Sequence, residues 1–168
     1  MNSAQLHLAF THVPVILSLI GLVMLIVALL MKNNTIIKTS YIVLTAAAVS
    51  AIPVFLTGEE AEEAVEHLPG VSESIISKHE SFATASMISI AVVGGFSLIA
   101  LFLYKHQLLS RIAKSSVLLL AFISGGLMAQ TAHLGGQIRH TEIRGGAALQ
   151  NNEAGNETPN KQNEKDED

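Results

Sequence analysis

Histidine is the residue type in this chain that points most directly to chemistry. The sequence contains seven histidines and no cysteine. The segment TAHLGGQIRH, from Thr131 to His140, places two histidines seven residues apart on either side of a glycine pair. Imidazole nitrogens bind transition metals and haem iron, and they change charge near neutral pH. The histidines are therefore the first candidates for a binding site.

The absence of cysteine limits the cofactors that the chain can hold. Disulfides, thiolate metal sites and the C-x-x-C-H attachment of a c-type haem are all excluded. The sequence also lacks G-x-S-x-G, H-E-x-x-H, P-loop and dinucleotide-binding motifs. The net charge is only -4, and no basic stripe indicates nucleic-acid binding. These absences favour an electron-transfer or accessory protein over a stand-alone enzyme.

The chain contains four long apolar segments. The segments are approximately Leu6–Met31, Ile36–Thr57, Phe82–Tyr104 and Ser115–Gln137. Each is long enough for a membrane-spanning helix, which needs about 20 apolar residues, and each is apolar on every side. The sequence therefore predicts an all-α membrane protein, an up-down four-helix transmembrane bundle with spans at about 6–31, 36–57, 78–104 and 112–140. Residues 1–144 form this domain, and residues 145–168 are predicted to be a disordered polar tail.

Charge predicts how the bundle is oriented. The two short connections contain no acidic residue. Their basic residues are Lys32, Lys38, Lys105, Arg111 and Lys114. The connection between the second and third spans is acidic and carries Glu59, Glu60, Glu62, Glu63, Glu66 and Glu73. By the positive-inside rule the short loops are cytoplasmic. Both termini and the acidic connection are then extracytoplasmic, in a multi-pass protein of the bacterial inner membrane.

The acidic connection and two prolines predict local structure. The segment TGEEAEEAVEHLPG has Thr57 and Glu60 at the spacing of a capping box, and its apolar residues recur with helical period. It predicts a short acidic amphipathic helix that could lie across the outer end of the bundle. Pro14 and Pro53 lie inside spans, where the missing N–H groups should bend the helices and free the carbonyls of Phe10 and Val49. A freed carbonyl could accept the N–H of a histidine ring, but the bends are also explained by helix packing alone, which is the favoured interpretation.

Six of the seven histidines fall at the predicted outer end. They are His7, His12, His67, His79, His133 and His140, whereas His106 lies in a cytoplasmic loop. Ionisable residues within spans usually face the interior and are functional candidates. Because the first and fourth spans are antiparallel, His12 and His133 are expected to form the deeper pair. His7, His79 and His140 are expected to form a shallower ring, with Glu80 beside it.

Glycines accompany the histidines on the fourth span. His133 and His140 share one helical stripe with Gly126, Ala129 and Gly136. The glycine pairs at 94–95, 125–126 and 135–136 suit either a flat ligand or close helix packing. The candidate cofactor-binding residues are therefore His7, His12, His79, His133, Gly126, Gly135 and Gly136.

Three interpretations of the histidines remain open. A b-type haem needs two axial imidazoles from different helices and an apolar pocket lined by small residues. Zinc or copper would need three or four ligands, drawn from His7, His12, His79 and His133 with His140 and Glu80 as further candidates. The third interpretation is a subunit of a larger membrane complex, whose histidines only pack or respond to pH.

Three segments of the chain resemble a known family. LHLAFTHVPVIL (Leu6–Leu17) resembles the H-P-x-x-x-H-F-P opening of an uncharacterised bacterial membrane family, domain of unknown function 2231, with Leu8 and Val13 departing from that pattern. HLGGQIRH (His133–His140) is similar to its closing motif, and FLTGEEAEEAVEHLPGVSE followed by KHE is similar to its acidic connection. The resemblance covers Leu6–His140.

The resemblance implies the outline of a four-helix b-type cytochrome. It implies a haem role for His7, His12, His79 and His133. The leading hypothesis is accordingly a membrane electron-transfer module with bis-histidine ligation of haem b near the extracytoplasmic face. Its expected partners are the lipid bilayer and a redox partner or larger membrane complex, with no nucleic acid.

Overall fold

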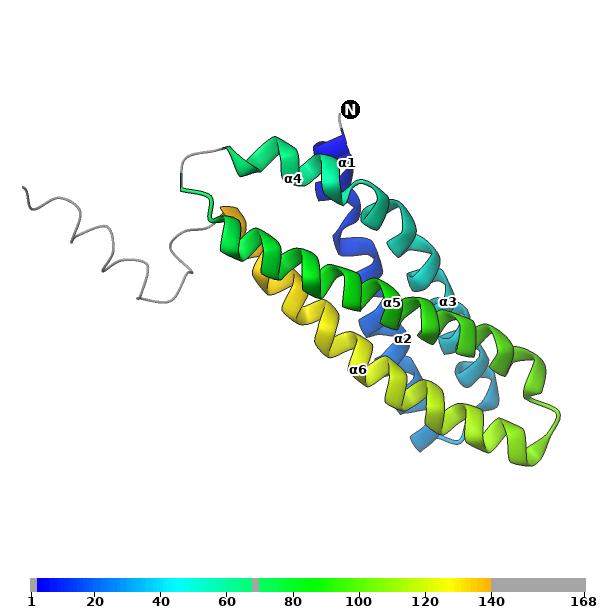
Figure 1. Cartoon of the computed structure of the whole chain (residues 1–168). Coiled ribbons are helices and arrows are strands. Elements are labelled where there is room, and N and C mark those ends of the chain that lie inside the picture. Colours follow the sequence, from blue (N-terminus) through cyan, green and yellow to red (C-terminus); the bar gives the residue numbers. More distant parts are fainter. Residues whose placement is uncertain (1–2, 68–69, 140–168) are drawn as a thin grey trace, which may run out of the picture.

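A computed structural model of the chain describes residues 3–67 and 70–139. These residues form helices and contain no strand. The helices are α1 (Ser3–Phe10), α2 (His12–Leu30), α3 (Asn34–Leu56), α4 (Gly58–Glu66), α5 (Glu73–Leu103) and α6 (Gln107–Arg139), as Figure 1 shows. The predicted all-α class is confirmed. The polar tail and His140 lie outside the described residues.

Four helical stretches are long and apolar enough to cross a membrane. They are Gln5–Leu30, Asn34–Leu56, Glu73–Leu103 and Gln107–Ile138. The third and fourth begin earlier than the predicted starts at residues 78 and 112, because apolar runs mark only the part of a helix suited to hydrocarbon. Backbone hydrogen bonding continues through the polar residues at each end. The 31 residues of α5 extend roughly 46 Å, which exceeds the thickness of a bilayer core.

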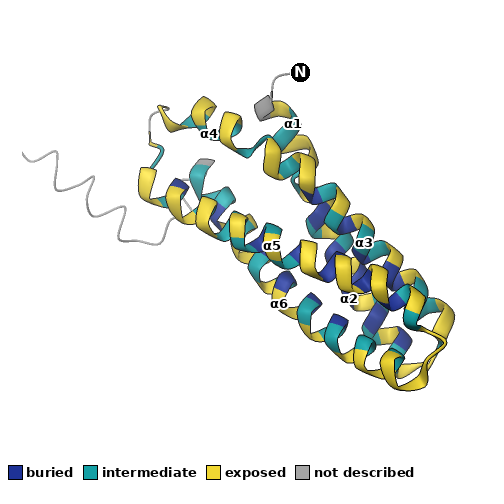
Figure 2. Ribbon diagram, turned by 45° about the vertical axis from the view of Figure 1, so that its right-hand side comes forward, coloured by how far each residue is buried: buried dark blue, intermediate teal, exposed yellow. Residues whose placement is uncertain are grey.

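The long helices pack around a shared apolar core. α2 packs on α3, α3 on α5, α5 on α6, and α6 again on α2. The largest fully buried apolar side chains are Leu25, Leu44, Ile90, Val93 and Val117, which together come from all four helices. The outward faces expose large apolar side chains along most of the bundle (Figure 2). An outer surface of this kind suits hydrocarbon better than water.

Glycine permits the closest approach between helices. A Cβ atom added at Gly94 of α5 would lie 2.4 Å from the Cβ atom of Ala48 on α3. One added at Gly21 of α2 would lie 2.8 Å from the Leu44 side chain, also on α3. At Gly94 the contacted Cβ atom is fixed to the backbone of α3, so a larger residue would push the two helices apart, whereas at Gly21 the buried Leu44 side chain would have to shift. α3 is therefore held tightly on two sides.

One end of the bundle carries the two short helices. α1 packs against α4, and both lie at the end where α5 begins and α6 finishes (Figure 1). The helix is interrupted at Thr11 between α1 and α2, about one turn before Pro14. Pro14 has no N–H to donate to the carbonyl of Phe10, so a break at this point follows from the sequence. The break allows α1 to contact α3 and α4.

Candidate functional site

His7 joins α1 to the end of α3. Its Nδ1 atom lies 3.0 Å from the carbonyl oxygen of Val54. That carbonyl belongs to the last turn of α3, where helical N–H donors run out. A carbonyl oxygen can only accept, so Nδ1 carries the proton and donates it. The neutral His7 ring therefore has a free lone pair on Nε2.

Thr57 completes this contact. Its hydroxyl lies 2.8 Å from the carbonyl oxygen of Pro53 and 3.2 Å from that of Val54. Thr57 precedes α4, but its side chain makes no capping hydrogen bond to that helix. The predicted capping box is therefore wrong, because the hydroxyl satisfies the carbonyls at the end of α3 instead. The carbonyls of Phe10 and Val49, expected as acceptors for a histidine, are not the ones that His7 uses.

His79 is held in the same manner on the other side of the bundle. It lies in the second turn of α5, half-buried, and its Nδ1 atom is 3.0 Å from the carbonyl oxygen of Thr131 on α6. The ring again donates from Nδ1 and leaves Nε2 free. Gly135 makes room for it, since a Cβ atom at that position would lie 3.1 Å from Cε1 of His79.

Pairs of hydroxyl groups join α5 to α6 in the turns of α5 that follow His79. The Oγ atom of Ser86 lies 2.8 Å from Oγ1 of Thr131, and Ser89 lies 3.1 Å from Ser124. Such hydroxyl pairs hold neighbouring helices in one register. Thr131 thus contacts His79 through its carbonyl and Ser86 through its side chain. The orientation of His79 is therefore set by α6 as well as by its own helix.

His7 and His79 lie at the same end of the bundle, His7 on α1 and His79 in the second turn of α5. Both side chains are half-buried. Both donate from Nδ1 to a helix carbonyl and keep Nε2 unprotonated in the neutral form. Histidines that bind a metal characteristically donate their other ring N–H to a carbonyl or carboxylate, which fixes the tautomer and orients the ring. Both imidazoles thus have the hydrogen-bonding pattern that is characteristic of metal-bound histidines.

His12 and His133, the expected deep pair, are placed differently. Both side chains are exposed on the outside of the bundle. The Nε2 atom of His133 lies 2.8 Å from Nε2 of Gln137, one turn later on the same helix. Because an amide nitrogen only donates, Nε2 of His133 is the acceptor and its lone pair is occupied. Helix rotation, which the sequence did not reveal, turns these two residues outward.

The remaining candidates lie apart from the pair. His67 and His106 are exposed, and His67 lies 3.0 Å from the carboxylate of Glu66. Glu80 is exposed. Within residues 3–67 and 70–139, no three His, Asp or Glu side chains come together as a metal site would require. Of the expected shallow ring, His7 and His79 are half-buried at the same end of the bundle, and His140 lies outside the described residues.

The candidate glycines differ in their surroundings. Gly135 contacts His79 closely, whereas a Cβ atom at Gly126 would meet nothing within 4 Å. Gly136 is half-buried on α6. Gly135 thus has a steric reason to be glycine that involves His79.

Sequence reasoning missed Thr57 and Thr131 as partners of the histidines. Thr131 lies one turn before Gly135 on α6, so the helical period could have placed both residues beside the same neighbour. For Val54 the acceptor is a backbone carbonyl, which carries no sequence signal beyond its position at the end of an apolar run.

The acidic helix α4 lies near the start of α5. Burial, together with the negative charges of Glu80, Glu66 and Glu59, raises the pKa of Glu62. A raised pKa means that the folded state favours the protonated carboxyl. The charged form opposes the docking of α4 above that pKa, and the opposition disappears as the pH falls through it.

Glu62→Gln is therefore expected to strengthen the docking of α4 at neutral pH. Amide hydrogen exchange in α4, corrected for its intrinsic pH dependence, should slow by about twofold, in line with the small effects of surface substitutions. The difference from wild type should vanish in acid. Glu63→Gln, on the exposed side of the same helix, is the control. Faster exchange in Glu62→Gln at neutral pH would contradict this account.

Comparisons with known proteins add nothing to the geometry described above. Neither a family model, nor a curated protein, nor a solved structure matches this chain. The resemblance to the uncharacterised bacterial family therefore stays a prediction.

Proposed function

We propose that this protein is a membrane electron-transfer module that binds b-type haem between His7 and His79. One observation carries the proposal. Both histidines hold Nδ1 on a helix carbonyl and present a free Nε2 from two different helices at one end of the bundle. A haem iron held by two imidazoles would exchange single electrons with a partner. The resemblance noted in the sequence supports the same cofactor.

The number of available ligands favours haem over zinc or copper. A structural zinc site takes four protein ligands and a catalytic one takes three. The part of the chain that the structure describes brings no three such side chains together. Haem requires only two from the protein. Two imidazoles with free Nε2 atoms therefore match the ligand number of haem better than that of a zinc or copper ion.

The proposal places the site at the extracytoplasmic end of an up-down four-helix transmembrane bundle. The end opposite the histidine pair carries the basic residues of the two short connections. The positive-inside rule then assigns that end to the cytoplasm of a bacterium and the pair to the outer face. α4, with its glutamates, would lie over this outer end. A redox partner would approach from the extracytoplasmic side.

Spectroscopy of the purified full-length protein tests the proposal. Reduced-minus-oxidised absorption spectra in mild detergent should show the α and Soret bands of a low-spin, bis-histidine haem. Haem and metal contents should be measured on the same sample. If the protein takes up no haem after supplementation with hemin, the proposal fails. Stoichiometric zinc or copper without haem would support the metal-binding alternative, and a colourless, metal-free protein recovered with a larger complex would support an accessory role.

Gly135→Ala should disturb the site without removing a ligand. The new Cβ atom would lie 3.1 Å from Cε1 and 3.3 Å from Nδ1 of His79, so the ring must tilt or its bond to Thr131 must lengthen. Weakening such a supporting contact typically lowers affinity about 10- to 100-fold. Hemin titration of the purified variant should show this loss. Gly126→Ala, which introduces no contact within 4 Å, should bind hemin like wild type, and equal affinities for all three proteins would contradict the assignment.

A further inference from the structure

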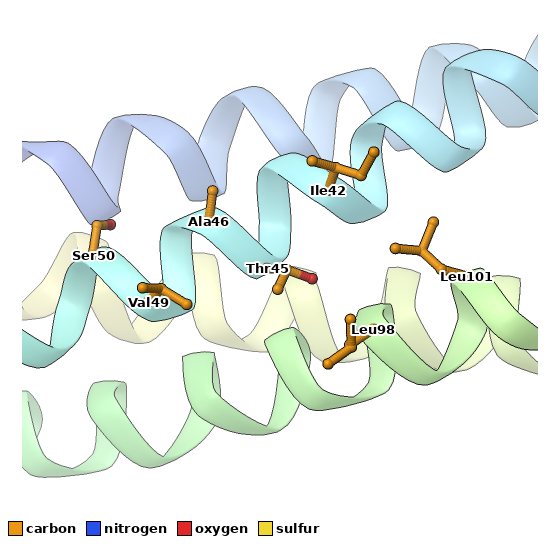
Figure 3. A pocket seen from close by; sticks show the side chains of 7 residues that line it. All are labelled: Ile42, Thr45, Ala46, Val49, Ser50, Leu98 and Leu101. Carbon is orange, nitrogen blue, oxygen red and sulfur yellow. The ribbon is translucent and has the colours of Figure 1, made fainter.

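A groove runs along the outside of the bundle between α3 and α5. It has a volume of about 470 Å³. Its lining residues are Ile42, Thr45, Ala46, Val49 and Ser50 from α3 and Leu98 and Leu101 from α5 (Figure 3). The hydroxyl of Thr45 donates to the carbonyl of Tyr41 at 2.9 Å, so it presents little polarity to the groove. The groove therefore offers an almost wholly apolar surface within the hydrophobic part of the bundle.

One end of this groove is basic. Lys38 lies one turn before Ile42 on α3, and Tyr104 lies one turn after Leu101, directly beyond the end of α5. The Nζ atom of Lys38 lies 3.6 Å from the centre of the Tyr104 ring, and that of Lys105 lies 6.0 Å from it. The ring thus holds one ammonium group across the two helices, and a second lies nearby.

No acidic residue of the adjoining sequence offsets this charge. The chain contains no Asp or Glu before Glu59 and none between Glu80 and Glu142. All the residues that form the lysine end of the bundle fall within these two stretches. The ammonium groups of Lys38 and Lys105 therefore attract an anion from outside the protein.

We propose that this groove binds an anionic phospholipid, with one acyl chain between α3 and α5 and the phosphate against Lys38 and Lys105. The inference goes beyond the haem proposal and requires only that the four helices cross a membrane. Charge complementarity selects the occupant, because a neutral lipid would leave both ammonium groups at the groove without a counter-charge. Basic pockets between membrane helices are known to suit anionic headgroups.

Lipid binding to the purified full-length protein tests this site. Native mass spectrometry in detergent should compare phosphatidylglycerol with phosphatidylcholine of the same acyl chains. Wild type should prefer phosphatidylglycerol, and Lys38→Gln should bind it about fivefold more weakly, which corresponds to about 1 kcal/mol for one lysine at an anionic surface. Lys114→Gln is the control, because that lysine is at the same end and donates to Asn34 at 3.4 Å, whereas Lys38 and Lys105 are the lysines beside the Tyr104 ring.

A second variant tests the apolar part independently. Ala46 is exposed in the groove, so Ala46→Phe should fill it without disturbing the core and should reduce the binding of both lipids. Helical content measured by circular dichroism verifies that the variants fold. Three results would overturn the proposal: equal binding of phosphatidylglycerol by wild type and Lys38→Gln, equal losses in Lys38→Gln and Lys114→Gln, or preferential retention of a neutral isoprenoid lipid by wild type.

Discussion

His79→Ala is expected to reduce the haem content of the purified protein by at least about tenfold and to abolish its bis-histidine spectrum. The substitution removes the proposed Nε2 ligand, whose ring is oriented by the Thr131 carbonyl at 3.0 Å. Loss of a supporting contact alone costs about 10- to 100-fold in affinity, so loss of the ligand should cost no less. Haem content per protein and reduced-minus-oxidised spectra measure the effect.

His7→Ala should have the same consequence, because two axial ligands are needed for the low-spin state. The matched controls are His12→Ala and His106→Ala, whose side chains are both exposed. These controls should retain wild-type spectra. If both His7→Ala and His79→Ala kept full haem content while His12→Ala lost it, the pairing proposed here would be incorrect.

Gly94→Ala is expected to destabilise the bundle by about 1–3 kcal/mol, the usual cost of forcing a methyl group into a packed interior. The added Cβ atom would lie 2.4 Å from the Cβ atom of Ala48, and the nearest backbone atom of α3, the Cα of Thr45, is at 3.8 Å. Two rigid helices must separate to relieve this contact. Thermal unfolding in detergent, followed by circular dichroism, should show a lower melting temperature than wild type.

The neighbouring Gly95 provides a matched control. It is exposed, and a Cβ atom there would meet nothing within 4 Å. Gly95→Ala should therefore leave the melting temperature unchanged or raise it slightly, because alanine has the higher helix propensity. Equal destabilisation by both substitutions would show that α5 needs glycine for a reason other than its contact with α3.

Much of the fold could be predicted from the sequence because hydropathy and proline act locally. Four apolar runs are each long enough to cross a bilayer, and the part of the chain that the structure describes contains four helical stretches of that kind. Pro14 predicts a disturbance of the first span, and the helix is interrupted at Thr11. α5 and α6 begin earlier than predicted, because each helix includes polar residues that hydropathy does not mark.

The candidate site could be predicted only in part. Residue type made the histidines candidates. Their positions in the sequence then placed six of the seven at the predicted outer end of the bundle. The spacing could not select His7 and His79, since the spans are apolar on every side and carry no stripe that reveals how each helix is rotated. A histidine therefore gives no sign in the sequence of whether it faces a neighbour, as His79 does, or the outside, as His133 does.

The sequence by itself determined the helical class, the four apolar spans and the charge difference between the two ends, because each depends on the composition of a single segment. Only the tertiary structure decided which histidines reach across to another helix and which carbonyls orient them. It also decided which glycines are required, since Gly135 lies against His79 while Gly126 faces open space. These features depend on the rotation and register of helices that are far apart in the chain, and packing sets both.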